Sequence, residues 1–293
     1  MPYHIPVLLK EAVAALAIRD NGLYLDATFG GGGHTRAILE SNPTCRVIAF
    51  DWDRYAIELN GPKMFEEFGD RLTLIWGNFA HCYRLLRKYK IKEVDGVLAD
   101  FGTSHHQIKN QDGFSFNTDT PLDMRMSKSH HYFSAHHVVN KFSARELSQI
   151  FFKYGEERHS RRIADAICER RETIPFNTTK QLANLITELI PSHPGRRIHP
   201  ATRVFQAIRI FVNKELDNIE LFMKNILSFI KPDGHLACIS FHSLEDRLVK
   251  SFIRDNEMLL SAITRKPIIP TEEEIAVNSP SRSAKLRIAA KKG

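Results

Sequence analysis

Four consecutive glycines, Gly30 to Gly33, form the first segment of this chain whose residue types suggest chemistry. They follow a short apolar run, residues 23–29, and precede a helical pattern that starts at Thr35. A strand, a glycine-rich turn and a helix start place backbone N–H groups where a ligand can approach them closely. Gly30 and Gly32 fit the Rossmann fingerprint but Thr35 occupies its sixth position, and the Lys-Ser/Thr of a P-loop is absent. The loop predicts a ligand site without nucleotide hydrolysis, and a tight turn is the structural alternative.

Asp51 ends the second apolar run, residues 45–50. An acid at this strand end is placed to accept hydrogen bonds from both ribose hydroxyls of an adenosine ligand. The structural alternative is that Asp51 caps a helix that starts at Trp52. Because a glycine loop follows the preceding strand, we favour the ribose role.

Asp100 closes the fourth apolar run, residues 94–99. An acid at this strand end faces the point where a substrate meets a cofactor. An exocyclic amine is a poor nucleophile because its lone pair is delocalised into the ring. A fixed hydrogen-bond acceptor on the amine N–H localises that lone pair and aligns it with an electrophilic methyl group. Asp100 suits this role, and a cap on the following turn is the structural alternative.

Strand and helix patterns alternate around these residues. Such alternation of apolar strands with helical stretches is typical of a parallel sheet with right-handed crossovers and helices on both faces. The sequence therefore predicts an α/β fold whose ligand lies beyond the carboxyl ends of the strands. The predicted strands of the sheet cover residues 23–29, 45–50, 72–76, 94–99 and 235–241.

The interval between Asp100 and Gly234 is much longer than the dozen or so residues that a crossover needs. Helical patterns at residues 142–171 and 179–190 predict a helical subdomain inserted there. A helix at residues 201–214 follows, with Phe205, Ile208 and Val212 on one core-facing side. The last predicted elements are a helix at residues 245–255 and strands at 259–263 and 284–289.

The composition is that of an ordinary globular chain. Its 41 Lys and Arg residues outnumber 34 Asp and Glu, and the net charge of +7 suits a polyanionic partner. No apolar run approaches the roughly 18 residues of a membrane span, and the N-terminus does not resemble a signal peptide. The four cysteines are scattered, which favours neither a zinc site nor disulfides. We expect a soluble, cytoplasmic protein.

Several other residue groups are open to a structural interpretation. Three pairs of adjacent histidines do not predict a metal site, because neighbouring side chains point apart. Ser240, His242 and Asp246 are too close along the chain for a hydrolytic triad, and the segment Ser243–Asp246 instead predicts a helix cap. Phe114 and Phe116 suit either stacking on a flipped base or core packing. Seven arginines suit either phosphate binding or a solvated surface: Arg158, Arg161, Arg162, Arg196, Arg197, Arg203 and Arg209.

Ordered sequence blocks extend through nearly the whole chain. They are His4-x-Pro6-Val7-Leu8-Leu9-x-Glu11, Asp26-x-Thr28-x-Gly30-x-Gly32-Gly33-His34-Thr35, Gly113-Phe114-Ser115-Phe116, Pro121-Leu122-Asp123-Met124-Arg125-Met126, Tyr154-Gly155-Glu156-Glu157-Arg158, His199-Pro200-Ala201-Thr202-Arg203-x-Phe205-Gln206-Ala207-x-Arg209, Ser240-Phe241-His242-Ser243-Leu244-Glu245-Asp246-Arg247 and Arg282-Ser283-x-x-Leu286-Arg287. In these blocks the chain resembles the RsmH (MraW) family of S-adenosylmethionine-dependent methyltransferases, which modify N4 of a cytosine in the decoding centre of bacterial 16S rRNA.

The resemblance implies a class I (Rossmann-like) methyltransferase fold and an S-adenosylmethionine site. By the same resemblance, Gly32, Gly33 and His34 contact the methionine part of the cofactor and Asp51 its ribose. The remaining implied cofactor contacts are Phe79 beside the adenine, and Asp100 and Gln107, which complete the pocket. Asp100 is also the predicted catalytic residue.

The expected domains are the methyltransferase domain, residues 1–104 and 201–293, and an inserted RNA-recognition subdomain, residues 105–200. The expected partner is small-subunit rRNA, within the ribosomal small subunit or a late assembly intermediate, and a homodimer is compatible with the sequence. Two other classes stay open. A dinucleotide-dependent oxidoreductase shares the glycine loop and Asp51 but leaves the later blocks unexplained. A non-catalytic RNA-binding assembly factor has the basic surface but needs no cofactor pocket.

Overall fold

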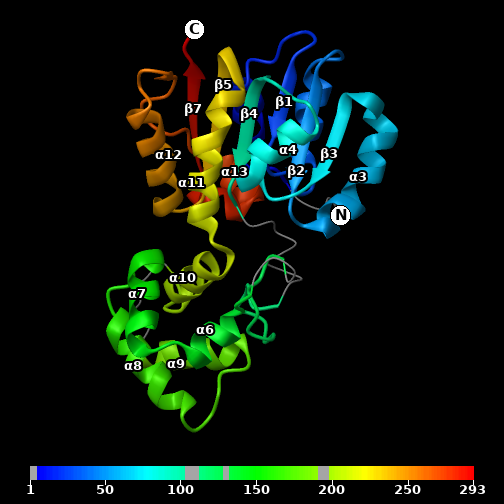
Figure 1. The fold of residues 1–293 in the computed structure, drawn as a ribbon. Helices are drawn as coiled ribbons and strands as arrows, with labels where there is room; N and C mark the ends of the chain where they lie inside the picture. The colour runs from blue at the N-terminus through cyan, green and yellow to red at the C-terminus, as the bar shows by residue number, and fades with distance from the viewer. Residues whose placement is uncertain (1–4, 103–111, 128–131, 191–197) are drawn as a thin grey trace. The chain divides into compact units, whose positions relative to one another are not determined.

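The chain forms two compact units in the computed structural model (Figure 1). The first unit joins residues 1–104 to residues 216–293, and the second consists of residues 105–215. The structure describes residues 5–102, 112–127, 132–190 and 198–293. Among these residues, no helix has the length and apolar character needed to cross a membrane.

A seven-stranded sheet forms the centre of the first unit (Figure 1). In spatial order its strands are β3 (Leu72–Trp76), β2 (Arg46–Asp51), β1 (Leu23–Asp26), β4 (Val94–Asp100), β5 (Ile230–Ser240), β7 (Lys285–Lys291) and β6 (Leu260–Ala262). The first five are parallel, whereas β7 runs antiparallel to both β5 and β6. The mostly parallel sheet is confirmed, and the direction of strand addition reverses between β1 and β4, where such sheets bind ligands.

Helices cover both faces of this sheet. They are α1 (Leu9–Ala15), α2 (Gly33–Ser41), α3 (Arg54–Phe68), α4 (Cys82–Lys88), α11 (Glu215–Ile226), α12 (Ser243–Asp255) and the short α13 (Glu272–Val277). Successive strand residues point to opposite faces. Leu25 and Phe50 therefore join a core with α4, α11 and α12, while Tyr24 and Ala49 join a second core with α1, α2 and α3. Two covered faces explain why the strands are apolar throughout.

Strand β5 begins earlier than the predicted residue 235. Its first residue, Ile230, pairs with Val94, and pairing resumes at His235 with Gly96 after a register shift. The intervening Lys-Pro-Asp-Gly sequence, which predicts a turn, includes Asp233 at φ 60°. It therefore forms an irregularity within the strand rather than its boundary.

The second unit is helical, as predicted. Its described helices include α6 (Ala135–Lys141), α7 (Ala144–Gly155), α8 (Ser160–Arg171), α9 (Thr179–Leu189) and α10 (Thr202–Asn213). The predicted core residues Phe205, Ile208 and Val212 are buried in its core. Helix α10 packs so closely on α7 that a Cβ at Gly155 would lie 2.4 Å from the Arg203 carbonyl oxygen. This packing includes α10 in the second unit, whereas the predicted boundary at residues 200–201 would assign this helix to the first domain.

The helical pattern at residues 142–171 forms two helices rather than one. Helix α7 begins with a capping box between Ser143 and Glu146, and its C-cap is Glu156, which has a left-handed φ of 49°.

Phe116 packs against other aromatic side chains of the second unit. Its ring stacks on His199 at 4.6 Å and meets Phe205 edge-on at 5.2 Å. The half-buried Phe116 thus packs against the core of this unit, which favours the structural interpretation of its role.

Candidate active site

The glycine loop connects β1 to α2, and its backbone conformation requires glycine. Gly30 has φ 51°, and Gly32, the N-cap of α2, has φ 76°. Both values lie in the left-handed region that glycine adopts readily. A Cβ at Gly30 would have no heavy atom within 4 Å, so the space beside this backbone is open. The first intrahelical hydrogen bond runs from the Arg36 N–H to the Gly32 carbonyl at 2.8 Å, and by helix geometry the preceding N–H groups face outward.

Gly33 is required for packing rather than for its dihedral angles. A Cβ at this position would lie 2.2 Å from the Cγ atom of Pro6. We expect Gly33→Ala to lower the free energy of unfolding by about 1–3 kcal/mol, because Pro6 or the start of α2 must move. Denaturant unfolding of Gly33→Ala, Pro6→Ala and the double variant measures the coupling. If Gly33→Ala costs the same with and without the Pro6 ring, the clash is not the cause.

Asp51 lies at the end of β2, directly beside the glycine loop. Its Oδ2 accepts a hydrogen bond from the Gly30 N–H at 2.7 Å, and its Oδ1 accepts one from the Asp53 N–H at 2.8 Å. Burial raises the pKa of Asp51 to about 7, although the two backbone hydrogen bonds oppose this shift. The N-cap of α3 is Asp53, which accepts from the Tyr55 N–H. The helix-cap alternative therefore applies to Asp53, and each Asp51 oxygen retains a lone pair for a ligand.

Asp100 lies at the end of β4, on the other side of the loop. Its N–H donates to the Thr28 hydroxyl at 2.8 Å, and its Oδ1 accepts from the Gly102 N–H at 3.3 Å. Burial raises the pKa of Asp100 to about 6, and the nearby His34 ring opposes this rise. The carboxylate thus does contact the following turn, but with one oxygen only. The other oxygen, Oδ2, lies 4.0 Å from Nδ1 of His34.

His34 is buried in the first turn of α2, and its ring is held by the N-terminal segment. Its Nε2 lies 3.0 Å from the Val7 carbonyl oxygen. A carbonyl can only accept, so Nε2 carries the proton of this hydrogen bond, and Nδ1 is the ring nitrogen that faces Asp100. The His34 ring therefore belongs to the surroundings of Asp100, and its backbone N–H is the group left for the predicted cofactor contact.

Asp26 is a buried acid that was not among the predicted site residues. Its Oδ2 accepts from the Thr35 hydroxyl at 2.6 Å, and its Oδ1 accepts from the Thr28 N–H at 3.0 Å. Burial raises the pKa of Asp26, although His34 and the hydrogen bonds oppose the shift. Asp26 thus ties the end of β1 to α2 and fixes the loop between them. Its position at the end of β1, directly before the glycine loop, was the available signal.

Phe79 follows β3 and supplies an apolar surface. Its half-buried ring lies 5.8 Å from that of Phe101 and meets the ring of Phe222 edge-on at 5.5 Å. The side chain of Asn78 caps this turn by accepting from the Ala80 N–H. The parallel strands therefore bring Phe79, Asp51, the glycine loop and Asp100 to the same side of the sheet, beyond the carboxyl ends of the strands. Gln107, the remaining predicted contact, lies outside the described residues.

The helix cap after β5 lies one residue earlier than predicted. His242, rather than Ser243, is the N-cap of α12, and its side chain accepts from the Glu245 N–H. The buried Glu245 carboxylate in turn accepts from the Phe241 N–H at 2.7 Å. Asp246 instead pairs with Arg287 at 2.6 Å. These separate partners exclude a triad of Ser240, His242 and Asp246.

The arginines of the second unit divide into exposed and paired groups. Arg158, Arg161 and Arg162 are exposed at the start of α8, and within the described residues none has an acidic group within 4.0 Å. Arg209 pairs with Glu215 at 2.9 Å and is not a free cation. Arg203 donates to a backbone carbonyl, and Arg196 and Arg197 lie outside the described residues.

Comparisons with known proteins agree over the full length of the chain. A family model described as the MraW methylase family matches residues 1–292. The ribosomal RNA small subunit methyltransferase H of Trichormus variabilis is 50% identical over 291 residues, which cover 99% of this chain and 92% of that protein. Its namesake from Magnetococcus marinus is 44% identical over an alignment 310 residues long, which covers 98% of each chain. A solved rRNA methylase from Streptococcus thermophilus aligns over 99% of both chains with a TM-score of 0.46 and 11% identity. As its sequence blocks predicted, the chain belongs to the MraW methylase family.

Proposed function

We propose that this protein transfers the methyl group of S-adenosylmethionine to N4 of a cytosine in the decoding centre of 16S rRNA. Membership of a methylase family makes it a methyltransferase and excludes the oxidoreductase alternative. The names of its relatives support small-subunit rRNA as the substrate. The observation that carries the proposal is the placement of two partly buried acids, Asp51 and Asp100, on either side of an open glycine loop.

The residues at the sheet edge fit S-adenosylmethionine. The partly buried Asp51 carboxylate keeps acceptor capacity for two ribose hydroxyls, and the open space beside Gly30 lets a ligand approach the backbone. The N–H groups of Gly33 and His34, in the first turn of α2, suit the carboxylate of the methionine part. The ring of Phe79 offers an apolar wall for the adenine. When bound, S-adenosylmethionine supplies a methyl group on a positively charged sulfur.

In this proposal Asp100 orients the target amine. Its Oδ1 is engaged by Gly102, so Oδ2 is the oxygen that accepts a hydrogen bond from the amine N–H. That hydrogen bond localises the nitrogen lone pair for in-line attack and stabilises the positive charge that develops on the nitrogen as it gains the methyl group. The nitrogen then loses one proton along the same hydrogen bond, and Oδ2 accepts it. With a pKa of about 6, Asp100 is mostly ionised at neutral pH. The His34 ring donates to Val7 through Nε2, and its Nδ1 lies 4.0 Å from Oδ2, beyond hydrogen-bond distance.

The direct test maps methylated cytosine in small-subunit rRNA by mass spectrometry, in cells with and without this protein. We expect one N4-methylated cytosine in the decoding centre to disappear with the protein and to return with the parental gene. An unchanged methylation map would contradict the proposed substrate. Titration of the purified protein with S-adenosylmethionine and with NAD tests the cofactor separately.

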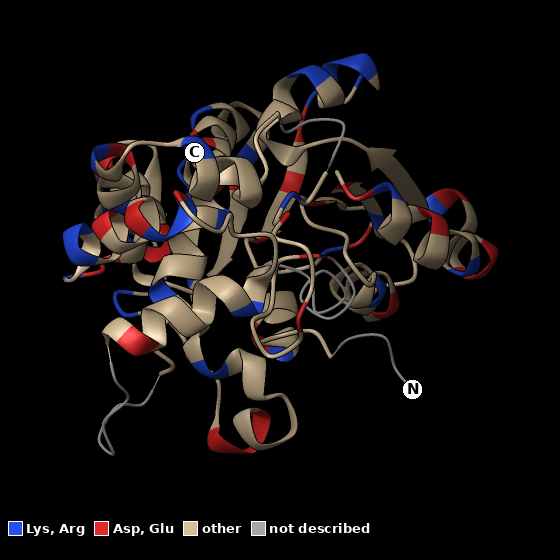
Figure 2. Ribbon diagram, turned by 90° about the horizontal axis from the view of Figure 1, so that it is seen from below, with Lys and Arg blue, Asp and Glu red and all other residues tan. Residues whose placement is uncertain are grey.

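The second unit is the proposed RNA-recognition subdomain, and its phosphate contacts are expected at α8. In Figure 2 basic and acidic segments both occur along the helices, so net charge alone does not locate the RNA surface. Arg161 and Arg162 are exposed and, among described residues, unpaired with acids. When such cations contact RNA phosphates, they displace the counterions of those phosphates, and RNA binding therefore depends on the salt concentration.

We therefore expect simultaneous replacement of Arg161, Arg162, Arg196 and Arg197 by glutamine to flatten the salt dependence of activity at subsaturating rRNA. Cofactor affinity should stay at the parental value. Arg170→Gln in the same helix is the matched control, because Arg170 already pairs with Glu188. A slope identical to the parental slope would place the RNA surface elsewhere.

A further inference from the structure

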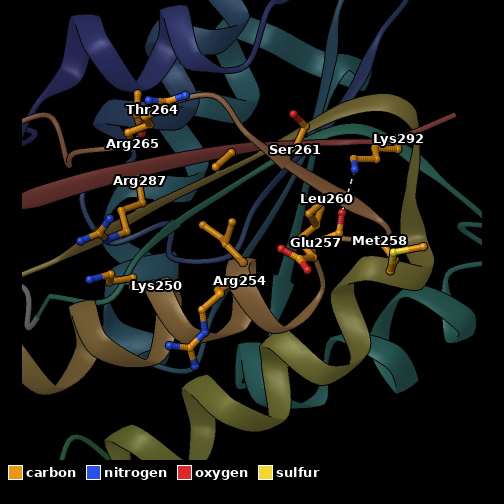
Figure 3. Close-up of a pocket in the computed structure, with 12 residues that line it drawn as sticks. Lys250, Arg254, Glu257, Met258, Leu260, Ser261, Thr264, Arg265, Arg287 and Lys292 are labelled. Atoms are coloured by element: carbon orange, nitrogen blue, oxygen red, sulfur yellow. Dashed lines mark hydrogen bonds between the residues drawn. The ribbon is translucent and has the colours of Figure 1, made fainter.

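A basic pocket of about 530 Å³ lies beside β6, the outermost strand on the side of the sheet opposite β3. Its walls are α12, the edge strand β6, the chain that follows β6 and the end of β7 (Figure 3). Strands β5 and β7 separate this edge pocket from β4, which carries Asp100. The edge pocket is therefore distinct from the site that holds Asp51 and Asp100.

Five cationic residues and one acid line the edge pocket. In Figure 3, Lys250 and Arg254 extend from α12, and Lys292 lies at the opposite end from Arg287. The fifth cation is Arg265, and the acid is Glu257. Because like charges repel, such a concentration of cations is favourable where an anion binds among them.

Two of these cations already lie beside an acidic side chain. Arg287 donates to both oxygens of Asp246, at 2.6 and 3.2 Å, and Arg254 lies 2.8 Å from Asp255. Burial opposes ionisation of Asp246, but the hydrogen bonds and charges of Arg287 and Lys285 hold its pKa below the usual value. The buried Arg287 thus forms a fixed, charge-balanced floor. Three cations remain to attract a ligand.

The three remaining cations carry the inference. The Lys292 ammonium donates to the backbone carbonyl of Glu257, at 2.8 Å, and has no acidic group within 4.0 Å among the described residues. Lys250 and Arg265 have no ion-pair partner within 4.0 Å among the residues that the structure describes. Against the single Glu257 carboxylate, the pocket keeps a surplus of positive charge. A charge surplus that the protein does not satisfy internally is complementary to an anionic partner.

The neutral groups of the pocket narrow the chemistry of that partner. Ser261 and Thr264 add hydroxyl groups, which join lysine and arginine as frequent ligands of phosphate oxygens in nucleic acids. The side chain of Met258, 84% exposed at the rim, offers an apolar contact for a sugar or base. Repeated phosphates on a polymer match cations at both ends of the pocket better than one small anion does.

We infer that the edge pocket binds the sugar-phosphate backbone of rRNA outside the target nucleotide, as a second RNA contact on the methyltransferase unit. This inference rests on the proposed function, because it takes the same rRNA as partner. Lys250 and Arg265 contact phosphates, and the Arg287–Asp246 pair supports the floor beneath them. The pocket increases the affinity for rRNA and helps to position the rRNA on the protein. It does not change cofactor binding or the methyl-transfer step.

The test compares the full-length protein with its Lys250→Gln/Arg265→Gln variant in binding to a small-subunit rRNA transcript over a range of salt concentrations. We expect binding to weaken about tenfold near 0.1 M salt and the logarithmic salt slope to fall by about two, one for each lost phosphate contact. The matched control, Lys63→Gln/Lys92→Gln, removes two exposed cations that do not line the pocket. Thermal unfolding and affinity for S-adenosylhomocysteine should match the parent in both variants. Cross-links from the parent to the transcript should map to peptides of residues 250–265.

Equal RNA binding by the pocket variant, the control and an active parent would overturn the inference and leave the proposed function intact. A parent that binds the transcript no better than an unrelated polyanion would overturn both. Retained RNA binding with selective loss of binding to phosphatidylglycerol vesicles would assign the pocket to a lipid surface instead.

Discussion

Replacing Asp100 with alanine is expected to slow methyl transfer about a hundredfold or more, the scale of losing one preorganised electrostatic contact. The Oδ2 atom is the acceptor that this replacement removes, and Oδ1 is already engaged by Gly102. Without an acceptor on its N–H, the amine keeps its lone pair in the ring and loses its alignment. Single-turnover rates at saturating S-adenosylmethionine measure this step, because saturation removes a pure binding defect.

Asp100→Asn separates the charge of this residue from its geometry. Asparagine keeps one acceptor oxygen but loses the negative charge, so an intermediate rate is expected. The parental rate should rise as the pH passes about 6, where Asp100 ionises, and the asparagine variant should lack that rise. If Asp100→Ala transfers methyl at the parental rate once saturated, Asp100 only binds the cofactor.

Much of the sheet and its ligand edge could be predicted from the sequence because both depend on local patterns. Buried parallel strands are apolar on both faces, so each strand is recognisable by itself. Parallel connection then brings all strand ends to one edge, which places Asp51 and Asp100 beside the same loop. The hydrogen bonds from Gly30 to Asp51 and from Asp100 to Thr28 agree with that placement.

The remaining features depend on contacts between distant residues. The sequence does not reveal that Val7 holds the His34 ring, or that Pro6 leaves no room for a side chain at residue 33. Helix α10 follows a Pro/Gly-rich segment that resembles a domain boundary, yet its close packing on α7 includes it in the second unit. Local sequence propensity indicates where a helix or strand begins, whereas tertiary packing determines which other elements it contacts.

Replacing Asp51 with alanine is expected to weaken cofactor binding by about 1–3 kcal/mol, through the loss of hydrogen bonds to a charged acceptor. The Gly30 N–H also loses its acceptor, but the position lies at a strand end and the fold should persist. Isothermal titration calorimetry with S-adenosylhomocysteine measures the change without turnover. Asp53→Ala is a matched control, because it removes a neighbouring acid that caps α3. Parental affinity in Asp51→Ala would mean that the ribose site lies elsewhere.

The pKa of Asp51 gives this prediction a second, independent readout. Ribose hydroxyls donate to the ionised carboxylate, so binding should strengthen as the pH rises through about 7, where the unliganded protein loses the Asp51 proton. A ligand that requires the ionised form gains about tenfold in affinity between pH 6 and pH 8 when that pKa is about 7. Ionisation of the ligand itself affects the parent and Asp51→Asn equally, so the difference between their pH profiles isolates Asp51.

The pH dependence of folding without ligand has the opposite sign. The raised pKa of Asp51 favours the protonated folded state, and that stability is lost as the pH rises through 7. As the pH rises from 5 to 8, Asp51→Asn should therefore lose less stability than the parent, and identical profiles of stability against pH for the two proteins would contradict a carboxyl group with a raised pKa at this position.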